Sequence, residues 1–427
     1  TVLACDPAGT FVIRREAGGC PLRAMADHFG KYPAIRIPHD GPPFGGGWIG
    51  FVSYEAGLAT ERIRPTTRCD VDVPLVRFGL YDAAAVYDHL VGQWWLAAVE
   101  WPRSFASRRP SVASRLRMLR QRLEDVGDPG PCESFGGDED AAMTANLSRS
   151  EYKARVDCAK RYIEAGDIYQ VNLTTRFSTR TSLSPVELYR RLRRTSPSSH
   201  AAFLGWQKTA VISASPELFL DLRAGHVVTR PIKGTRPRGV DADEDDVLRR
   251  ELVESEKDRA ELTMIVDLLR NDLGRVCSFG SVRVLEGGEI ETHPTVFHRV
   301  ATVEGQLAGG RSWSDLLPAA FPGGSITGAP KIRAMQIIDE LEPTHRGVYC
   351  GSIGWIGLDG SMSLNIAIRT MVQIEDMVHA YAGGAVVAES DAEKEYEEVL
   401  AKAAGMFRAI QGGAWVESVP VSEVTAS

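Results

Sequence analysis

The chain has 427 residues, of which 44% are hydrophobic and 25% are charged, a composition typical of a soluble globular protein with a large core. Its net charge of −7 offers no basic patch for nucleic acid, and no apolar run approaches the ~18 residues of a membrane-spanning helix. Seven cysteines without a CxxC pair, and a first segment unlike a signal peptide, argue against a disulfide framework and predict a cytoplasmic protein.

The first part of the chain is predicted to be an N-terminal subdomain of mixed strand and helix over residues 1–125. Within it, 45–51 (GGGWIGF) is a glycine-rich entry to a strand. Residues 126–146 have the proline, glycine and acidic composition of an exposed linker. We therefore expect a second region over 147–415, followed by a tail over 416–427.

The second region opens with a predicted helix that ends at Gly166. Ser148 and Glu151 form a capping-box pattern at its start. The segment 168–177 then alternates like a strand, and four polar residues share one of its faces: Gln170, Asn172, Thr174 and Arg176. A wet cavity explains this polar face, and so does an exposed sheet face.

The remaining elements are mostly strands. Short strands are predicted at 209–221, 226–233, 281–286, 349–358, 363–374 and 378–388. Helices are predicted at 244–272, 330–341 and 392–411. Many strands with few strand–helix–strand alternations indicate a largely antiparallel α+β architecture.

Several segments carry a family resemblance, and they follow one another in the expected order. They are 168–173 (IYQVNL), 215–220 (SPELFL), 231–236 (PIKGTR), 258–274 (DRAELTMIVDLLRNDLG), 323–335 (GGSITGAPKIRAM), 346–349 (RGVY) and 382–390 (AGGAVVAES). Together they resemble the chorismate-utilising enzymes, the anthranilate synthase component I superfamily.

The resemblance implies a complex single α+β domain with two facing antiparallel β-sheets flanked by helices. Its active site would lie in the cleft between the sheets, with 147–415 as the chorismate-binding catalytic region. Residues 1–125 would then be a regulatory or partner-binding region. For the glycine-rich segment two interpretations stay open, a tight turn beside a core strand or a pocket for a regulatory aromatic amino acid.

Chorismate is a dicarboxylate with a poor hydroxyl leaving group at C4, so its conversion asks for a cation, an acid and a nucleophile. By resemblance, Glu261 and Glu398 bind the cation, and Glu395 contributes directly or through water. Carboxylates on two helices, with waters and a substrate carboxylate, suit Mg²⁺. The acid is Glu217, whose pKa would have to be raised by burial or by a neighbouring carboxylate.

The remaining site residues also follow from the resemblance. His298 is placed in the catalytic set, with a structural histidine as the alternative. Gly383 and Gly384 permit a close approach of the backbone to the ligand. The complete set of expected substrate contacts is Gln170, Gly234, Thr235, Gly328, Tyr349, Arg369, Gly383, Gly384 and Lys402.

Two positions choose between branches of the superfamily. Branches that add water have a lysine base where this chain has Gln170, and a neutral amide cannot deprotonate water. Branches that add ammonia at C2 have alanine at the position of Lys233. By resemblance, a lysine there adds to C2 and redirects ammonia to C4, giving 4-amino-4-deoxychorismate, the precursor of p-aminobenzoate. Its amine must be neutral, for which Arg236 and Mg²⁺ are candidate cationic neighbours.

The supply of ammonia points to a partner. Glutamine hydrolysis needs a cysteine nucleophile on a strand–turn–helix elbow, and no cysteine here has a Gly-x-Cys-x-Gly setting. We therefore expect a separate glutamine amidotransferase subunit. Two alternatives remain, an anthranilate-forming component I and a non-catalytic subunit that binds chorismate or tryptophan. A pure binder has no need of an acid and an amine.

Overall fold

The structure is a computed structural model that describes residues 1–16, 18–38, 40–102, 105, 109–125, 142–293, 295–412 and 422–423. Most of the predicted linker 126–146 and of the tail 416–427 lies outside these residues. The division into subdomains stays a prediction. Strands from 9–81 nevertheless continue one of the two large sheets of the later region, because β3 (Gly47–Val52) pairs with β17 (Ser352–Gly357).

Two large, mainly antiparallel sheets confirm the α+β prediction. Within the described residues the first has ten strands, along the path β13 (Ile232–Pro237), β15 (Val296–Gln306), β12 (His226–Arg230), β11 (Leu218–Arg223), β18 (Met362–Asn365), β17, β3, β4 (Val76–Tyr81) and β2 (Gly9–Ile13), with β14 (Arg283–Thr292) on β15. The second has eight, along the path β21 (Ser422–Glu423), β7 (Thr144–Ala145), β8 (Gln170–Arg180), β20 (Met377–Val386), β19 (Thr370–Ile374), β10 (Thr209–Ser215) and β9 (His200–Trp206), with β16 (Gly328–Ala329) on β8.

The chain passes from one large sheet to the other within two segments that were each predicted as one strand. The predicted strand 209–221 is β10 of the second sheet followed by β11 of the first. The predicted strand 363–374 is likewise β18 followed by β19. Both predictions of a single continuous strand were wrong, because in each segment the chain leaves one sheet and enters the other. The predicted strand 226–233 is also divided, at Pro231, whose nitrogen has no hydrogen to donate.

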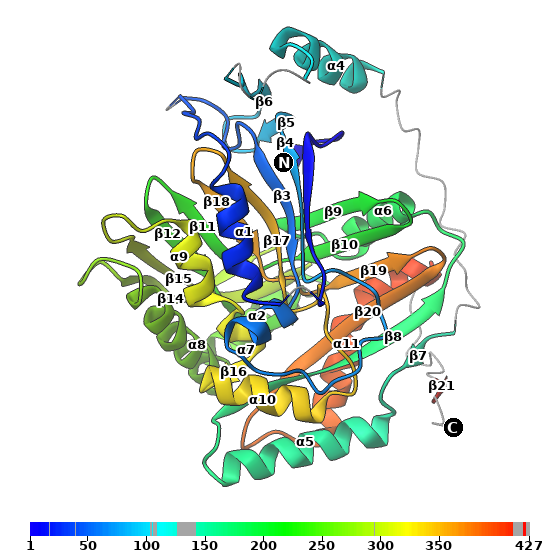
Figure 1. The fold of residues 1–427 in the computed structure, drawn as a ribbon. Helices are drawn as coiled ribbons and strands as arrows, with labels where there is room; N and C mark the ends of the chain where they lie inside the picture. Colours follow the sequence, from blue (N-terminus) through cyan, green and yellow to red (C-terminus); the bar gives the residue numbers. More distant parts are fainter. Residues whose placement is uncertain are drawn as a thin grey trace.

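Helices lie outside the sheets (Figure 1). Helix α5 (Arg149–Glu164) has the predicted capping box, and α11 (Ala392–Gln411) lies along β20 and β8, where Phe407 meets Phe177 edge to face at 5.0 Å. Of the helices described, none has both the length and the apolar character required to cross a bilayer. The others are α1 (Pro21–Phe29), α2 (Glu55–Thr60), α4 (Val112–Glu124), α6 (Pro185–Thr195), α7 (Ala242–Glu254), α8 (Glu256–Gly274), α9 (Trp313–Ala320) and α10 (Lys331–Leu341).

The helix predicted over 244–272 is in fact two helices, α7 and α8. They separate at Ser255, which has an extended backbone and whose hydroxyl accepts a hydrogen bond from the backbone N–H of Asp258. Ser255 thus caps α8, as serine commonly does at a helix start. The break gives α8 its own direction, along β13 and β15.

A small third sheet joins β1 (Val2–Leu3), β5 (Ala83–Asp88) and β6 (Gln93–Ala98). Together with α4 it stands at one end of the molecule (Figure 1). The predicted strand entry at 45–51 is confirmed as β3, whose Trp48 is buried and stacked on Phe29 at 4.1 Å. That packing accounts for the segment as part of the core.

Candidate active site

Glu217 and Arg369 lie at the two points where the chain crosses from one large sheet to the other. Glu217 follows the end of β10, and its carbonyl accepts a hydrogen bond of 3.1 Å from the backbone N–H of Ile366, beside the second crossing. Arg369 precedes β19 and is largely buried, and within the described residues no carboxylate lies within 4 Å of its guanidinium group. A buried cation without a protein anion suits an anionic ligand.

Glu217 has the properties of an acid at neutral pH. Its side chain is buried, and the Ser325 hydroxyl donates a hydrogen bond of 2.6 Å to its Oε1. Burial raises its pKa from the ordinary 4.5 to about 7, although the Ser325 bond and the charges of Lys233 and Lys402 act in the opposite direction. A carboxyl group with such a pKa can donate a proton at neutral pH.

Lys233 lies on β13 with its amine turned toward α8. Its Nζ is 3.8 Å from Oε2 of Glu261, and both side chains are little exposed, 12% and 13%. Burial lowers the pKa of Lys233, and the nearby Lys402 lowers it further, against the attraction of Glu261. The next residue, Gly234, has a φ of +83° and a close approach to Asp258, which a side chain would not tolerate.

Three carboxylates face one another across α8 and α11. Glu261 comes from α8, and Glu395 and Glu398 come from α11, three residues apart on one helix face. Burial raises the pKa of Glu261 and of Glu395. Burial acts in the same direction on Glu398, but the ammonium of Lys402, 2.7 Å away, brings its pKa below the ordinary value.

These carboxylates are oxygen donors of the kind that the predicted magnesium ion takes. Oε2 of Glu395 is buried and has no hydrogen-bond partner among the described residues, so it has an unused site for a cation. In the same part of the chain, no three Asp, Glu, His or Cys side chains are arranged to hold a metal by themselves. Mg²⁺ usually takes one or two protein carboxylates and completes its shell with substrate oxygens and water.

Thr235, His298 and Arg369 form a second group, with Thr235 and His298 on paired strands of the first sheet and Arg369 at the second crossing. The Thr235 hydroxyl and Nδ1 of His298 share a hydrogen bond of 2.9 Å across paired strands. Burial, together with the charge of Arg369, lowers the pKa of His298 to about 3. His298 is therefore neutral at physiological pH, which suits a hydrogen-bonding role better than that of a proton donor.

Several of the other expected substrate contacts lie at the start of β8 or toward the end of β20, which are neighbouring strands. Gln170 is buried beside β16, where Gly328 pairs with its neighbour Val171, and its side-chain amide has no partner among the described residues. Gly384 faces α11, since a Cβ there would stand 2.9 Å from Oε2 of Glu395.

The polar face of strand 168–177 is therefore buried, which excludes an exposed sheet face. The Lys402 ammonium donates a hydrogen bond of 3.0 Å to the carbonyl of Gly383. Tyr349 stacks on Tyr381, which shares a strand face with Gly383, at 5.4 Å between ring centres. Among the described residues, no hydrogen bond links Tyr349 to Glu261, Glu395 or Glu398, so its role stays a prediction.

The structure adds two residues and relocates a third. Ser325 lies within a matched segment, but only the fold brings it to Glu217. Lys257 precedes Glu261 by four residues, a spacing that predicts an ion pair on a helix, and its Nζ lies 3.9 Å from Glu261. Arg236 is directed to Asp258 at 3.4 Å, so the cationic neighbour of Lys233 is Lys402 and not Arg236.

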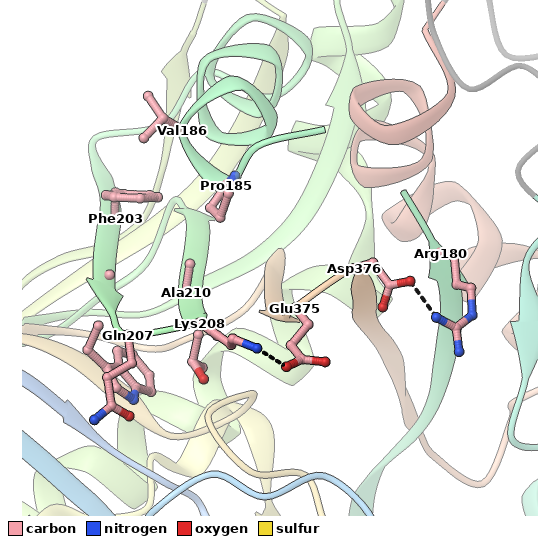
Figure 2. Close-up of a pocket in the computed structure, with 12 residues that line it drawn as sticks. Arg180, Pro185, Val186, Phe203, Gln207, Lys208, Ala210, Glu375 and Asp376 are labelled. Carbon is pink, nitrogen blue, oxygen red and sulfur yellow. Dashed lines mark hydrogen bonds and ion pairs between the residues drawn. The ribbon is translucent and has the colours of Figure 1, made fainter. Parts of the chain in front are cut away.

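A large cavity of about 880 Å³ lies elsewhere (Figure 2). It opens at the far ends of β8, β10 and β20, ten residues along β8 from Gln170, or about 33 Å at the rise of a strand. Figure 2 shows its two ion pairs, Lys208 with Glu375 and Arg180 with Asp376. None of the expected site residues lines it.

The chain matches a family of chorismate binding enzymes and proteins named as two kinds of synthase. The family described as chorismate binding enzyme matches residues 12–408. Anthranilate synthase component 1 of Thermus thermophilus is 41% identical over 92% of this chain and 82% of its own length. Aminodeoxychorismate synthase component 1 of Bacillus subtilis is 39% identical over 92% of this chain and 83% of its own length.

Solved structures agree with the fold. Anthranilate synthase component I from Streptococcus pneumoniae superposes with a TM-score of 0.82 at 33% identity, covering 96% of this chain and 92% of that one. The menaquinone-specific isochorismate synthase MenF of Escherichia coli has a TM-score of 0.72 at 16% identity, covering 96% of this chain and 86% of that one. The second likeness concerns the fold alone.

Proposed function

The chain belongs to the chorismate binding enzyme family and is a chorismate-utilising enzyme, and from this premise we propose that it is an aminodeoxychorismate synthase component I. It would convert chorismate and ammonia to 4-amino-4-deoxychorismate. The observation that carries the proposal is the buried amine of Lys233, which shares a site with the protonatable carboxyl of Glu217.

In the proposed reaction the neutral amine of Lys233 attacks C2 of chorismate. The ring double bonds shift, and the C4 hydroxyl leaves as water after it receives a proton from Glu217. Ammonia then adds to C4, the C2–nitrogen bond breaks, and the lysine amine is released. The lysine nitrogen gives up one proton when it bonds to C2, which restores the proton of Glu217, and the proton that the added ammonia gives up returns to the lysine nitrogen as the C2–nitrogen bond breaks.

Magnesium is the proposed cofactor, with Glu261 and Glu398 as ligands and Glu395 beside them. When bound, the ion would neutralise a substrate carboxylate and orient the ring. The protein's own groups support the remaining contacts. Arg369 offers a buried cation for the second carboxylate, and the Gly384 backbone leaves room next to Glu395.

The ammonia is proposed to come from a separate glutamine amidotransferase subunit. Similar proteins are named component 1, and no cysteine of this chain has the Gly-x-Cys-x-Gly setting of a glutamine-hydrolysing elbow.

Anthranilate synthase component I is the second candidate, because proteins of that name are about as similar to this chain as aminodeoxychorismate synthases are. Lys233 favours the first candidate, since an amine bonded to C2 blocks addition of ammonia there.

Product analysis tests the choice. The purified chain is incubated with chorismate, Mg²⁺ and an ammonium salt, and the products are separated and identified by mass spectrometry. We expect 4-amino-4-deoxychorismate. Anthranilate as the main product would assign the chain to the other branch, and binding without conversion would leave only a chorismate-binding subunit.

A further inference from the structure

Lys257 connects the two helices that supply the carboxylates. It lies one turn before Glu261 on α8, and its Nζ is 3.9 Å from Oε1 of Glu261 and 3.9 Å from Oε1 of Glu395 on α11. The two carboxylates are largely buried, whereas the Lys257 side chain is 54% exposed. The ammonium group therefore enters the carboxylate cluster from the solvent side.

Lysine side chains surround the carboxylates of this part of the site. Glu261 lies near Lys233 and Lys257, Glu395 lies near Lys257, and Glu398 pairs with Lys402. In the described part of the chain, Lys257 is the only cation within 4 Å of Glu395. Without it, Glu395 would keep one hydrogen bond, from the Ser390 hydroxyl, and one orphaned oxygen. Burying a carboxylate without a neighbouring cation lowers the stability of the folded protein.

Of the three lysines, Lys257 is the one that can leave. Lys402 is fixed by contacts of 2.7 Å to Glu398 and 3.0 Å to the Gly383 carbonyl. Lys233 is buried, with 12% of its side chain exposed. Both contacts of Lys257 are longer than a hydrogen bond, so its withdrawal into solvent gives up charge neutralisation and no hydrogen bond.

We propose that Lys257 is a tethered counter-ion for the metal site: its ammonium neutralises Glu261 and Glu395 in the metal-free protein, and a divalent cation displaces it. The proposal rests on the metal site of the proposed function. It makes Lys257 a residue that sets metal affinity, because the ion must compete with a positive charge already attached to the protein. It also explains how a buried carboxylate cluster persists without metal.

The test measures metal binding without substrate or turnover. Mn²⁺ serves as the probe, and its free concentration is read from the electron paramagnetic resonance signal of the hydrated ion. Lys257→Met keeps much of the side-chain length but removes the charge, and we expect Mn²⁺ to bind about tenfold more tightly than to the wild-type chain. The matched control is Lys153→Met, whose ammonium pairs α5 with α11 through Glu393 at 2.7 Å, and it should leave Mn²⁺ affinity unchanged.

A second readout is thermal. The metal-free Lys257→Met protein should melt at a lower temperature than the metal-free wild type. Saturating Mg²⁺ should raise the melting temperature of Lys257→Met by more than it raises that of the wild type. Equal or weaker Mn²⁺ binding by Lys257→Met would overturn the role of Lys257. Absence of binding in both proteins would remove the metal site and this proposal with it. A product other than 4-amino-4-deoxychorismate bears only on the branch, since the binding assay involves no product.

Discussion

Lys233 and Glu217 share one buried site, and burial moves the pKa of each toward that of the other. The pKa of the amine falls below its ordinary 10.5, and that of the carboxyl rises to about 7. In water these groups would form an ion pair. Burial shifts both groups toward their neutral forms, and these are the forms that the proposed attack at C2 and loss of the C4 hydroxyl require.

The pH dependence of the first half-reaction should follow Glu217. We expect covalent adduct formation in the absence of ammonia to slow as the pH rises through about 7, because Glu217 then loses its proton. The Ser325 hydrogen bond lowers the pKa of Glu217, so Ser325→Ala should move this decline to higher pH. Rapid-quench mass spectrometry at roughly pH 6–9, around the expected pKa of Glu217, measures the pH at which adduct formation declines in each protein. Ser281→Ala, in a turn, is the control. If Ser325→Ala leaves the pH of this decline unchanged, the Ser325 hydrogen bond does not influence the pKa of the acid.

A stability prediction concerns Arg346, which is 2% exposed. Its guanidinium pairs with Glu342 at 2.6 Å and donates hydrogen bonds to the carbonyls of Ile326 and Asn172, joining β8 to the segment before β16. Arg346→Met should lower the free energy of unfolding by about 3–5 kcal/mol, because it leaves a buried carboxylate unpaired. Urea denaturation measures the change.

The double variant Arg346→Met/Glu342→Gln checks the physical reason for that loss. It removes the unpaired charge as well, so it should recover part of the stability that Arg346→Met loses. If Arg346→Met loses less than about 1 kcal/mol of unfolding free energy, the Arg346–Glu342 pair contributes no more than an exposed ion pair does, which contradicts the prediction.

The metal ligands give a third prediction. Glu261→Gln and Glu398→Gln should each reduce Mg²⁺-dependent product formation by roughly 100-fold or more, because each removes a charged oxygen ligand. Their melting curves should stay cooperative. Glu393→Gln changes a glutamate of α11 that pairs with Lys153 instead, and it should remain active. A Glu261 or Glu398 variant with near wild-type turnover would remove that residue from the site.

The partner gives a fourth prediction. The purified chain should form no product with glutamine as the nitrogen source, because it lacks a glutamine-hydrolysing cysteine site. With a high concentration of ammonium at alkaline pH it should work slowly, since more free ammonia is present. Product formation is followed by chromatography. Glutamine-supported synthesis by the isolated chain would contradict the need for a separate amidotransferase.

The sequence predicted the fold class and the elements with strong local signals. The capping box of Ser148 and Glu151 and the helix over 392–411 are present as expected. The crossings at Glu217 and Arg369 could not be predicted from local pattern, because a strand that changes sheets has the same alternation on both sides of the break. The break at Ser255 was missed because the helical pattern continues beyond the capping serine.

For the site, the family pattern predicts a set of residues, whereas contacts that tertiary packing creates have no pattern in the sequence. In the structure, the charges of Glu217, Glu261 and Glu398 all act on the pKa of Lys233. The spacing of Lys257 and Glu261 on one helix predicts their ion pair, but the contact of Lys257 with Glu395 depends on where the fold places α11 relative to α8. No sequence pattern encodes that distance.

The last prediction concerns Lys233, on which the branch assignment depends. Chain incubated with chorismate and Mg²⁺ but without ammonia should accumulate a covalent adduct with the mass of chorismate less one water. Intact-protein mass spectrometry should detect it, and peptide mapping should place it on 231–236.

Lys233→Ala should lose the adduct, and because ammonia regains access to C2, its residual product should shift toward anthranilate. Lys233→Arg should be nearly inactive, because a guanidinium group stays protonated and cannot attack. Lys208→Arg, at a surface ion pair with Glu375, is the matched control and should behave as wild type. Efficient synthesis of 4-amino-4-deoxychorismate by Lys233→Arg would exclude the nucleophile and leave Lys233 as an electrostatic contact, since a permanently charged side chain preserves the charge but not the lone pair that the reaction needs.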